Sequence, residues 1–401
     1  MQFETIEGGE VEAVLAALAD AFLEDLDQGE AALDAKVVEP ERTLVARDGG
    51  RIVACGAIVS RELTVPGGPL PVAGVTLVGV APTHRRRVLL SGMMRRQLAA
   101  MHAAGEAVAA LWASEAAIYG RYGYGLATHQ ARLEVRTREA RMRPDVERAG
   151  APRIMPAADA RSRIAAVHEA VRTRRPGMLA RTGPWWDLRL YDPEDWREGA
   201  GTLRAAVLDD DAGYVLYAFK QNWDVGPDGE LRLRELVART PAAAAALWGF
   251  VLEVDLVRRA SWFLAPADEP LPHMLDNARA VTSARVGDGL WVRLVDVPRA
   301  LRERTYSAPF GVVLGVADAI CPWNVGRYRL SWDGSDAACE PTADEPDLEL
   351  SAAELGAAYL GGTTLAQLAA AGRVCARSEA ALQSASLAFR GTVEPWCPEL
   401  F

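Results

Sequence analysis

The sequence predicts a mixed α/β protein of two or three domains. Its 401 residues exceed one ordinary domain, since a domain usually holds roughly 100–200 residues. Residues 1–130 alternate short apolar runs typical of strands with segments whose apolar residues recur at helical spacing. A polar, proline-containing stretch at residues 138–152 interrupts this pattern. The mixed region that follows faintly repeats the earlier order of strands, helix and strand.

The elements expected in the first region are bounded by glycine-rich turns. Asp48-Gly49-Gly50 separates the first two strands, and residues 65–69 form a second turn. A helix is expected at residues 11–22 because its apolar residues fall on one face. The expected strands are 43–47, 52–59, 72–80, 108–112 and 131–136, and the other helices are 89–104 and 118–122.

The second and third regions also mix both types of element. Pro241 is well placed in the first turn of a helix, where its missing N–H is not needed. The second region is expected to contain helices 161–174 and 241–254 with strands 202–208, 214–220 and 231–238. The third is expected to contain strands 290–295, 312–316 and 326–332, then helices 352–359, 364–371 and 379–388.

The composition is that of a soluble globular protein. Half of the residues are hydrophobic and 24% are charged, which argues against extensive disorder. The net charge of −10 repels phosphate backbones, so we expect no nucleic-acid partner. An acidic surface would attract a cationic partner, although it also serves ordinary solubility.

Targeting and redox features indicate a cytoplasmic protein. No basic segment followed by an apolar core begins the chain, and no apolar run reaches the ~18–20 residues of a membrane span. The cysteines are odd in number and scattered, which fits a reducing compartment. The five histidines are dispersed, so we expect no metal site. The cysteines are Cys55, Cys321, Cys339, Cys375 and Cys397.

The segment that carries chemistry runs from an apolar strand through Arg85-Arg86-Arg87 into a helix. A helix N-terminus offers free backbone N–H groups and the positive end of the helix dipole. Arginines beside it add charged donors, so the segment can hold a pyrophosphate. A solvated basic turn or an RNA-contacting patch is the alternative, but the position between a buried strand and a helix favours pyrophosphate.

Two motifs resemble a known family. Residues 78–87, Val-x-Val-x-Pro-x-x-Arg-Arg-Arg, resemble the acetyl-CoA motif of the GNAT superfamily of N-acetyltransferases, whose pattern is Arg/Gln-x-x-Gly-x-Gly/Ala. Residues 113–125, Ala-Ser-Glu-Ala-Ala-Ile-Tyr-Gly-Arg-Tyr-Gly-Tyr-Gly, narrow the resemblance to the Eis acetyltransferases of actinobacteria. Segments 269–273, 289–293 and 359–362 are also similar, so the resemblance covers essentially the whole chain.

The resemblance implies two tandem GNAT domains followed by a sterol-carrier-like α+β domain, assembled as a homohexamer. The implied boundaries are residues 1–130, a linker at 131–150 that could add a strand to the C-terminal domain, 151–289 without a CoA motif, and 290–401. The implied reaction transfers acetyl from acetyl-CoA to primary amines of aminoglycosides, polyamines or protein lysines. The implied partners are therefore a cationic amine and acetyl-CoA, without a metal or a membrane.

The resemblance also implies roles for individual residues. Tyr119 is the expected general acid, and the terminal carboxylate of Phe401 is the expected base, whose pKa of about 3.5 in water desolvation can raise. Residues 77–80 supply edge hydrogen bonds to pantetheine. The expected acetyl-CoA contacts are Val78, Val80, Arg85, Arg86, Arg87, Val88, Leu89, Leu90 and Ser114, and the expected substrate contacts are Phe22, Glu24, Leu77 and Leu400.

Two positions depart from the pattern of the resembling family, and an acidic residue lies close to one of them. Val88 replaces a glycine that lets pyrophosphate approach the backbone, and we expect weakened but retained binding, with a helical backbone that valine tolerates. Leu400 stands where the family often has an acid, and Glu399 lies one residue earlier. Val88 also sustains the alternative that the chain is a degenerate, non-catalytic protein that binds a lipid or a protein partner.

Overall fold

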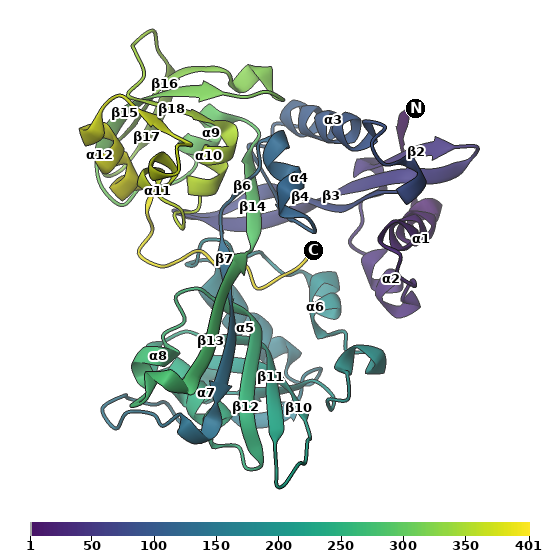
Figure 1. The fold of residues 1–401 in the computed structure, drawn as a ribbon, viewed down its shortest axis with the longest axis vertical. Helices are drawn as coiled ribbons and strands as arrows, with labels where there is room; N and C mark the ends of the chain where they lie inside the picture. The colour runs from purple at the N-terminus through teal and green to yellow at the C-terminus, as the bar shows by residue number, and fades with distance from the viewer. Residues whose placement is uncertain (1) are drawn as a thin grey trace. The chain divides into compact units, whose positions relative to one another are not determined.

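The protein divides into two compact units in the computed structural model, which describes residues 2–401 (Figure 1). Unit 1 contains the described residues up to Thr128, then Gly289–Pro395 and Leu400–Phe401. Unit 2 contains His129–Asp288 and the short segment Trp396–Glu399. The chain therefore enters unit 1 three times, and its last six residues are shared between the two units.

Unit 1 contains a seven-stranded sheet in the order β1-β2-β3-β4-β5-β14-β6. The strands β4 and β5 are parallel, and the other neighbours are antiparallel. Pro66 and Gly67 turn the long β3–β4 hairpin, as the sequence predicts. The strands are β1 (Phe3–Thr5), β2 (Thr43–Asp48), β3 (Arg51–Val65), β4 (Gly68–Val80), β5 (Val108–Trp112), β6 (Gly125–Leu126) and β14 (Leu290–Leu294).

Helices cover both faces of this sheet (Figure 1). Helix α1 (Val11–Phe22) buries Val14 and Leu15 against one face, and α3 (Leu89–Ala103) buries Met94 and Leu98 against the other. In both helices the apolar residues recur at the helical spacing that predicts them from the sequence. Helix α2 (Gln28–Asp34) follows α1, and α4 (Ala116–Tyr119) follows β5.

Strand β14 corrects the expected start of the C-terminal domain. We expect residues 290–295 to open that domain, but β14 lies between β5 and β6. Val292 pairs with Ala110 on one side and with Gly125 on the other. An apolar strand buried on both sides satisfies its backbone groups best inside a sheet, and local sequence does not reveal which sheet accepts it.

The rest of unit 1 is the C-terminal α+β region, with a five-stranded sheet in the order β17-β16-β15-β18-β19. Helix α12 packs on β15 and α9 packs near β17. The strands are β15 (Phe310–Ala317), β16 (Gly326–Trp332), β17 (Ala337–Pro341), β18 (Leu348–Ser351) and β19 (Cys375–Ala376). The helices are α9 (Val297–Arg302), α10 (Ala352–Ala358), α11 (Leu365–Ala370) and α12 (Glu379–Phe389).

An arginine fills the interior of this region. Arg304 is 2% exposed, and its guanidinium lies 4.6 Å from the ring centre of Tyr306 and 4.7 Å from that of Phe389. It donates hydrogen bonds to the carbonyls of Tyr359 at 2.5 Å and Phe389 at 2.8 Å. Aromatic rings and a guanidinium bound to backbone carbonyls therefore fill this part of the interior. A lipid ligand would need open space at the same place.

Glycines let helix α10 lie directly against the first sheet. A Cβ on Gly125 would overlap the Ala353 carbonyl oxygen and the Ala357 amide nitrogen. A Cβ on Gly356 would overlap the Val292 carbonyl oxygen. Gly125 belongs to the Tyr-Gly-Tyr-Gly end of the family motif, and its role here is close packing between backbones.

Unit 2 contains a second seven-stranded sheet in the order β13-β7-β12-β11-β10-β9-β8. Its helices are α5 (Arg161–Arg172), α6 (Gly183–Leu190), α7 (Pro241–Glu253) and α8 (Leu271–Met274); Thr240 caps α7. The strands are β7 (His129–Arg136), β8 (Arg153–Pro156), β9 (Arg204–Val207), β10 (Gly213–Lys220), β11 (Gly229–Ala238), β12 (Val257–Pro266) and β13 (Val281–Asp288).

Strand β7 corrects a second expectation. The segment 131–150 is expected to be a linker that could add a strand to the C-terminal domain, but β7 pairs with β12 and β13 of the second sheet. Its alternate residues Ala131, Leu133 and Val135 are buried in the core of unit 2. The period-two pattern predicts the strand correctly, while its partner depends on contacts distant in sequence.

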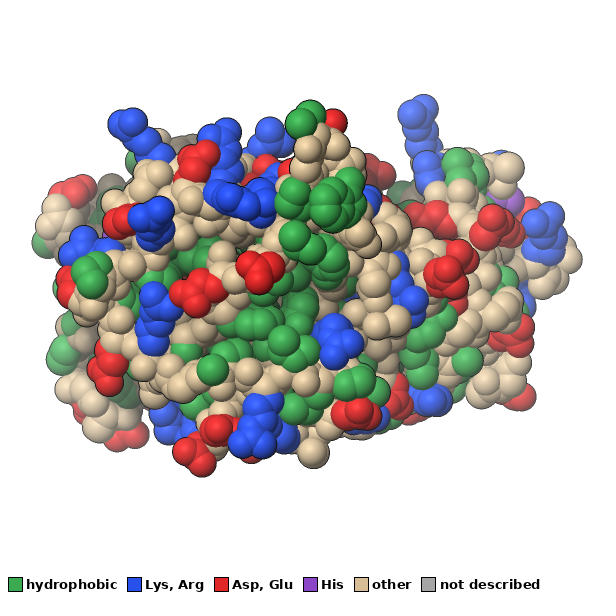
Figure 2. Space-filling view, turned by 90° about the horizontal axis from the view of Figure 1, so that it is seen from below, with side chains coloured by type: hydrophobic (Ala, Val, Ile, Leu, Met, Phe, Trp, Pro, Cys, Tyr) green, Lys and Arg blue, Asp and Glu red, His purple; other side chains and the backbone are tan. Residues whose placement is uncertain are grey.

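Charged side chains of both signs are interspersed on the face of the molecule shown in Figure 2, around hydrophobic side chains in its middle. No helix within residues 2–401 is long and apolar enough to cross a membrane. Over the same residues, no group of three or more His, Cys, Asp or Glu side chains is arranged to hold a metal ion.

Candidate active site

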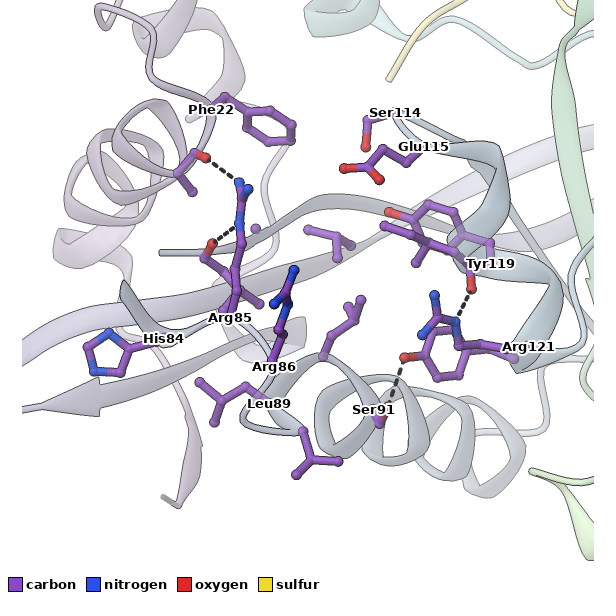
Figure 3. Close-up of a pocket in the computed structure, with 18 residues that line it drawn as sticks. Phe22, His84, Arg85, Arg86, Leu89, Ser91, Ser114, Glu115, Tyr119 and Arg121 are labelled. Carbon is purple, nitrogen blue, oxygen red and sulfur yellow. Dashed lines mark hydrogen bonds between the residues drawn. The ribbon is translucent and has the colours of Figure 1, made fainter. Parts of the chain in front are cut away.

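A cavity of about 690 Å³ in unit 1 gathers most of the residues that the sequence singles out (Figure 3). It lies where β4, the N-terminus of α3 and the segment after β5 meet. Phe22 at the end of α1 completes one side. Of the expected residues, Phe22, Val78, Val80, Arg85, Arg86, Val88, Leu89, Leu90, Ser114 and Tyr119 line it.

One wall of the cavity is an open strand edge. Strand β4 pairs with β5 only at Ala73 and Gly74. Beyond Gly74 the described residues provide no strand partner on that edge up to Val80. Leu77 has φ of 54°, close to a break in the β3–β4 register, and such irregularities bend a strand and redirect its backbone groups. This edge can therefore offer hydrogen bonds to an extended ligand.

The N-terminus of α3 forms the opposite wall. The Gly92 N–H bonds the Val88 carbonyl as the first helical hydrogen bond, so the N–H groups of residues 89–91 are available to an anion. Figure 3 shows the Arg86 side chain reaching into the cavity beside this helix end. The arrangement suits a pyrophosphate, because charge, helix dipole and backbone donors all favour a negative group there.

The three arginines play different parts. The Arg85 guanidinium donates to the carbonyls of Ala21 at 3.0 Å and Val80 at 3.5 Å. It lines the cavity while tying the end of α1 to β4. Arg87 is exposed and does not line the cavity, so the expectation that its side chain contacts the ligand is not supported.

Val88 corrects a further expectation. We expect a helical backbone at this position, but Val88 is the N-cap of α3 and has φ of 61° and ψ of 10°. This left-handed region costs an L-residue roughly 1–2 kcal/mol, and a β-branched side chain suits it poorly. The side chain is 76% exposed and lines the cavity. Glycine would therefore relieve both the strain and the crowding.

The substitution Val88→Gly is expected to raise stability by about 1 kcal/mol. Relief of roughly 1–2 kcal/mol of strain is offset by the greater unfolded-state entropy of glycine, roughly 0.4–1 kcal/mol. The acetyl-CoA dissociation constant is expected to fall. Urea unfolding and calorimetric titration measure the two effects, and Val78→Gly is the control, because φ at Val78 is not positive. Weaker binding by Val88→Gly would contradict the crowding argument.

Tyr119 faces the arginines across the cavity. It ends α4, is 5% exposed, and directs its phenol oxygen into the cavity near Ser114 and Glu115 (Figure 3). Burial raises the pKa of the Tyr119 phenol, and its hydrogen bond with Ser114 partly opposes this shift. The phenol is therefore protonated at neutral pH and able to donate a proton to a leaving group.

The expected substrate contacts are not all at the cavity. Glu24 and Leu400 are exposed and do not line it, and half-buried Leu77 packs toward α1. The ring of Phe401 lies on Gly74, where a Cβ would come within 3.2 Å of the ring. Gly74 is also the last residue of β4 that pairs with β5, so Phe401 marks the point where the two strands diverge.

Several residues of the cavity are not among those expected from the sequence. Glu115, Arg121 and Tyr122 line it, although all three stand in the quoted motif. Ser91, in the first turn of α3, shares a 2.9 Å hydrogen bond with the Tyr122 hydroxyl. The motif itself could have identified these residues, because its short helical turns place their side chains on the same side as Tyr119.

The diverging parallel strands, the arginine-flanked helix end and the buried phenol define an N-acetyltransferase of the GNAT class. The GNAT acetyltransferase domain profile matches residues 2–127, a second GNAT profile matches 177–294, and the sterol carrier protein domain profile matches 297–398. The fold is thus two tandem GNAT domains with a sterol-carrier-like domain, and it implies acetyl-CoA as co-substrate.

Similar proteins identify the family of GNAT acetyltransferases to which the chain belongs. An uncharacterized N-acetyltransferase of Streptomyces avermitilis is 43% identical over 372 residues, covering 91% of this chain and 90% of that protein. The N-acetyltransferase Eis of Mycobacterium tuberculosis is 35% identical, covering 88% and 89%. The crystal structure of Eis1 from Mycobacterium abscessus aligns over all of both chains, with a TM-score of 0.87 and 33% identity. The chain belongs to the Eis family of N-acetyltransferases.

Proposed function

We propose that the protein transfers acetyl from acetyl-CoA to a primary amine of a cationic substrate, with Tyr119 as general acid and the Phe401 carboxylate as base. The observation that carries the proposal is the single cavity that joins the open edge of β4, the N-terminus of α3 with Arg86, and the Tyr119 phenol. These are the groups that pantetheine, pyrophosphate and a departing thiolate require.

The proposed reaction forms one carbon–nitrogen bond, breaks one carbon–sulfur bond and transfers two protons. The amine nitrogen attacks the thioester carbonyl carbon, and a backbone N–H on the open edge of β4 stabilises the developing oxyanion. The carbon–sulfur bond then breaks, and the CoA thiolate takes a proton from the Tyr119 phenol. The amine loses its proton to the terminal carboxylate. Transfer through solvent returns a proton to Tyr119 and regenerates both groups.

Charge supports a cationic acceptor. The net charge is −10, and Glu115 places a carboxylate in the cavity beside Tyr119. Aminoglycosides, polyamines and protein lysines all fit this description and remain the proposed substrate classes. The homohexamer and the absence of a membrane partner are proposed on the resemblance. The absence of a nucleic-acid partner is proposed on the acidic charge, and the cytoplasmic location on the scattered cysteines.

Turnover itself distinguishes this proposal from a non-catalytic role. The experiment mixes the protein with acetyl-CoA and, separately, spermidine, an aminoglycoside and a lysine peptide, and follows the free CoA thiol. Release that requires both protein and amine is expected with at least one acceptor class. Acetyl-CoA binding without release across the panel would favour the degenerate binding protein.

The substitution Tyr119→Phe is expected to lower kcat by roughly 10²-fold, because the thiolate loses its proton donor. Since burial raises the pKa of Tyr119, the wild-type rate should show no loss from ionisation of this phenol below about pH 10. Tyr124→Phe is the matched control: its buried hydroxyl has no hydrogen-bond partner in the described part of the chain. Equal rates for both variants would contradict the role of Tyr119.

A further inference from the structure

Unit 2 contains a second pair of parallel strands joined by a helix, like the pair that opens the cavity of unit 1. Strands β11 and β12 pair from Gly229 to Leu233 and from Val257 to Trp262, respectively. Helix α7 connects them, as α3 connects β4 and β5 (Figure 1). Within residues 2–401, the last five residues of β11, 234–238, have no strand partner on the β12 side. Unit 2 therefore has an open strand edge of its own, here called the second cleft.

The N-terminus of α7 is closed to an anion, unlike that of α3. Pro241 is the first residue of α7 and has no N–H. The Ala243 N–H donates to the Thr240 hydroxyl at 3.2 Å, and the Ala244 N–H donates to the Thr240 carbonyl at 3.0 Å as the first helical bond. In the described part of the chain, Ala242 alone keeps a free N–H in this turn, whereas α3 keeps three. The second cleft thus lacks the backbone donors that hold a pyrophosphate.

The segment Trp396–Glu399, which belongs to unit 2, lies at the second cleft. The indole N–H of Trp396 donates at 2.9 Å to the carbonyl of Leu264, two residues past the last residue of β12 that pairs with β11. The Trp396 ring meets the ring of Trp262 edge to face, with 5.9 Å between the ring centres. Its backbone N–H donates to the Pro176 carbonyl at 2.8 Å, and the residue is 3% exposed. This indole therefore fills the β12 side of the second cleft.

Glu399 reaches the β11 side of the second cleft through an arginine. Glu399 is 6% exposed, and the Arg181 Nε donates to its carboxylate at 3.0 Å. The other two nitrogens of the same guanidinium donate at 2.9 and 2.6 Å to the carboxylate of Glu235, two residues past the last residue of β11 that pairs with β12. The segment therefore bridges the two strands just beyond the point where their pairing ends.

The charges around Arg181 favour an acid at position 399. Arg181 and Arg189 both pair with Glu235, so these three groups carry one excess positive charge. Glu399 supplies the balancing negative charge. The Nε2 of His168 lies 4.0 Å from Glu399, and burial lowers the pKa of His168 to about 3, so it adds no charge at neutral pH. Because a buried charge without its partner is costly, the second cleft selects an acidic residue.

We propose that the second cleft is a peptide-binding site, with the chain's own segment Trp396–Glu399 as its ligand in place of a CoA. The ligand class is a short peptide with a tryptophan and, three residues later, an acid. Gly177, at φ of 94°, makes room for the peptide backbone, because a Cβ there would lie 2.8 Å from backbone atoms of Trp396. This role of the second GNAT domain goes beyond acetyl transfer and depends on neither Tyr119 nor Phe401.

The first test adds the segment back as a free peptide. The probe is a fluorescent, amidated peptide of residues 392–399, and anisotropy measures its binding to the full-length chain. The double variant Trp396→Ala/Glu399→Ala, whose own segment no longer fits, is expected to bind the peptide. Wild type should bind it at least about tenfold more weakly, because its attached segment competes at an effective concentration of about a millimolar. Circular dichroism checks folding, and Glu399→Ala alone gives the same comparison with a smaller structural change.

Changes within the peptide test which groups the second cleft recognises. Glu399→Ala or Trp396→Ala in the peptide should weaken binding by at least about 30-fold, the effect of losing a buried ion pair or a central aromatic anchor. Val393→Ala is the matched control, because Val393 is 41% exposed and lies outside the bound segment. Equal affinities for all four peptides, or no binding by a folded double variant, would overturn the proposal.

Acetyl-CoA provides an independent test of the same cleft. Calorimetry is expected to give one acetyl-CoA per chain for wild type and for the double variant, because the end of α7 cannot hold a pyrophosphate. A second acetyl-CoA on the double variant would mean that the segment only covers a cofactor site, and would overturn the proposal. Neither test measures turnover, so a chain that binds the peptide but transfers no acetyl would contradict the proposed function and leave this inference standing.

Discussion

Removal of Phe401 is expected to lower kcat for acetyl transfer by about 10²–10⁴-fold, the range that one general base contributes. The new terminal carboxylate would belong to Leu400, one residue before the position whose ring contacts Gly74. The acetyl-CoA dissociation constant should not change, because Phe401 does not line the cavity. Calorimetry and thiol release on the same preparation measure both quantities.

Two companion variants separate the ring of Phe401 from its carboxylate. One alanine appended after Phe401 keeps the ring but moves the carboxylate by a residue, and should lower kcat nearly as much as the deletion. Phe401→Ala keeps the carboxylate at its position and loses the ring contact with Gly74, so a smaller loss is expected. Full turnover in the appended chain would refute the terminal-carboxylate mechanism.

The substitution Gly125→Ala is expected to cost more than about 4 kcal/mol of stability, among the largest effects of one methyl group. The added Cβ would overlap backbone atoms of Ala353 and Ala357, which no rotamer change can relieve. Helix α10 would have to move away from β6 and β14. At about 2–4 °C per kcal/mol for a unit of this size, the melting temperature should fall by about 10 °C or more.

Gly120→Ala is the matched control for that substitution. Gly120 belongs to the same motif, its φ is not positive, and an added Cβ would meet nothing within 4 Å. Its stability should change by about 0.5 kcal/mol or less. Thermal scans at one heating rate compare the three proteins, and similar melting temperatures for both variants would contradict the close-packing role of Gly125.

Local pattern predicts the elements whose apolar residues are either periodic or continuous. Helix α1 spans the expected residues 11–22, strand β5 the expected 108–112, and α7 begins at Pro241 as expected. In α1 the apolar residues have the helical period because one face packs in a core. Strand β5 and most of α7 are buried instead, and the sequence shows them as continuous apolar runs. The turn at residues 65–69 is likewise predicted by proline and glycine.

The missed elements show neither a clear apolar period nor a continuous apolar run. Strand β13 is half-buried or exposed along its whole length, so its residues show no clear alternation. In α2 only Ala31 is buried. Strand β12 begins Val-Arg-Arg-Ala-Ser, and its polar residues hide a strand that pairs on both sides. Contacts with neighbouring elements give these segments their secondary structure. The pattern of a single sequence does not contain those contacts.

Some features of the site can be predicted from short motifs, and others depend on contacts between residues that are distant in the sequence. Short motifs identify Arg86, Ser114 and Tyr119 as cavity residues because they are consecutive with the elements that place them. The left-handed backbone of Val88 and the burial of Glu399 against Arg181 are not local properties. They depend on how the strand β4 enters α3 and on a partner 218 residues away.

The position of β14 between β5 and β6 has a consequence for how the protein is made. When the acetyl-CoA motif has left the ribosome, β5 still lacks its neighbour, because residues 129–288 must be synthesised before β14. At 5–20 residues per second, this delay is on the order of 10–30 s. During that time the nascent chain carries an unpaired apolar strand edge, a site where chaperones bind and where premature association of two chains begins.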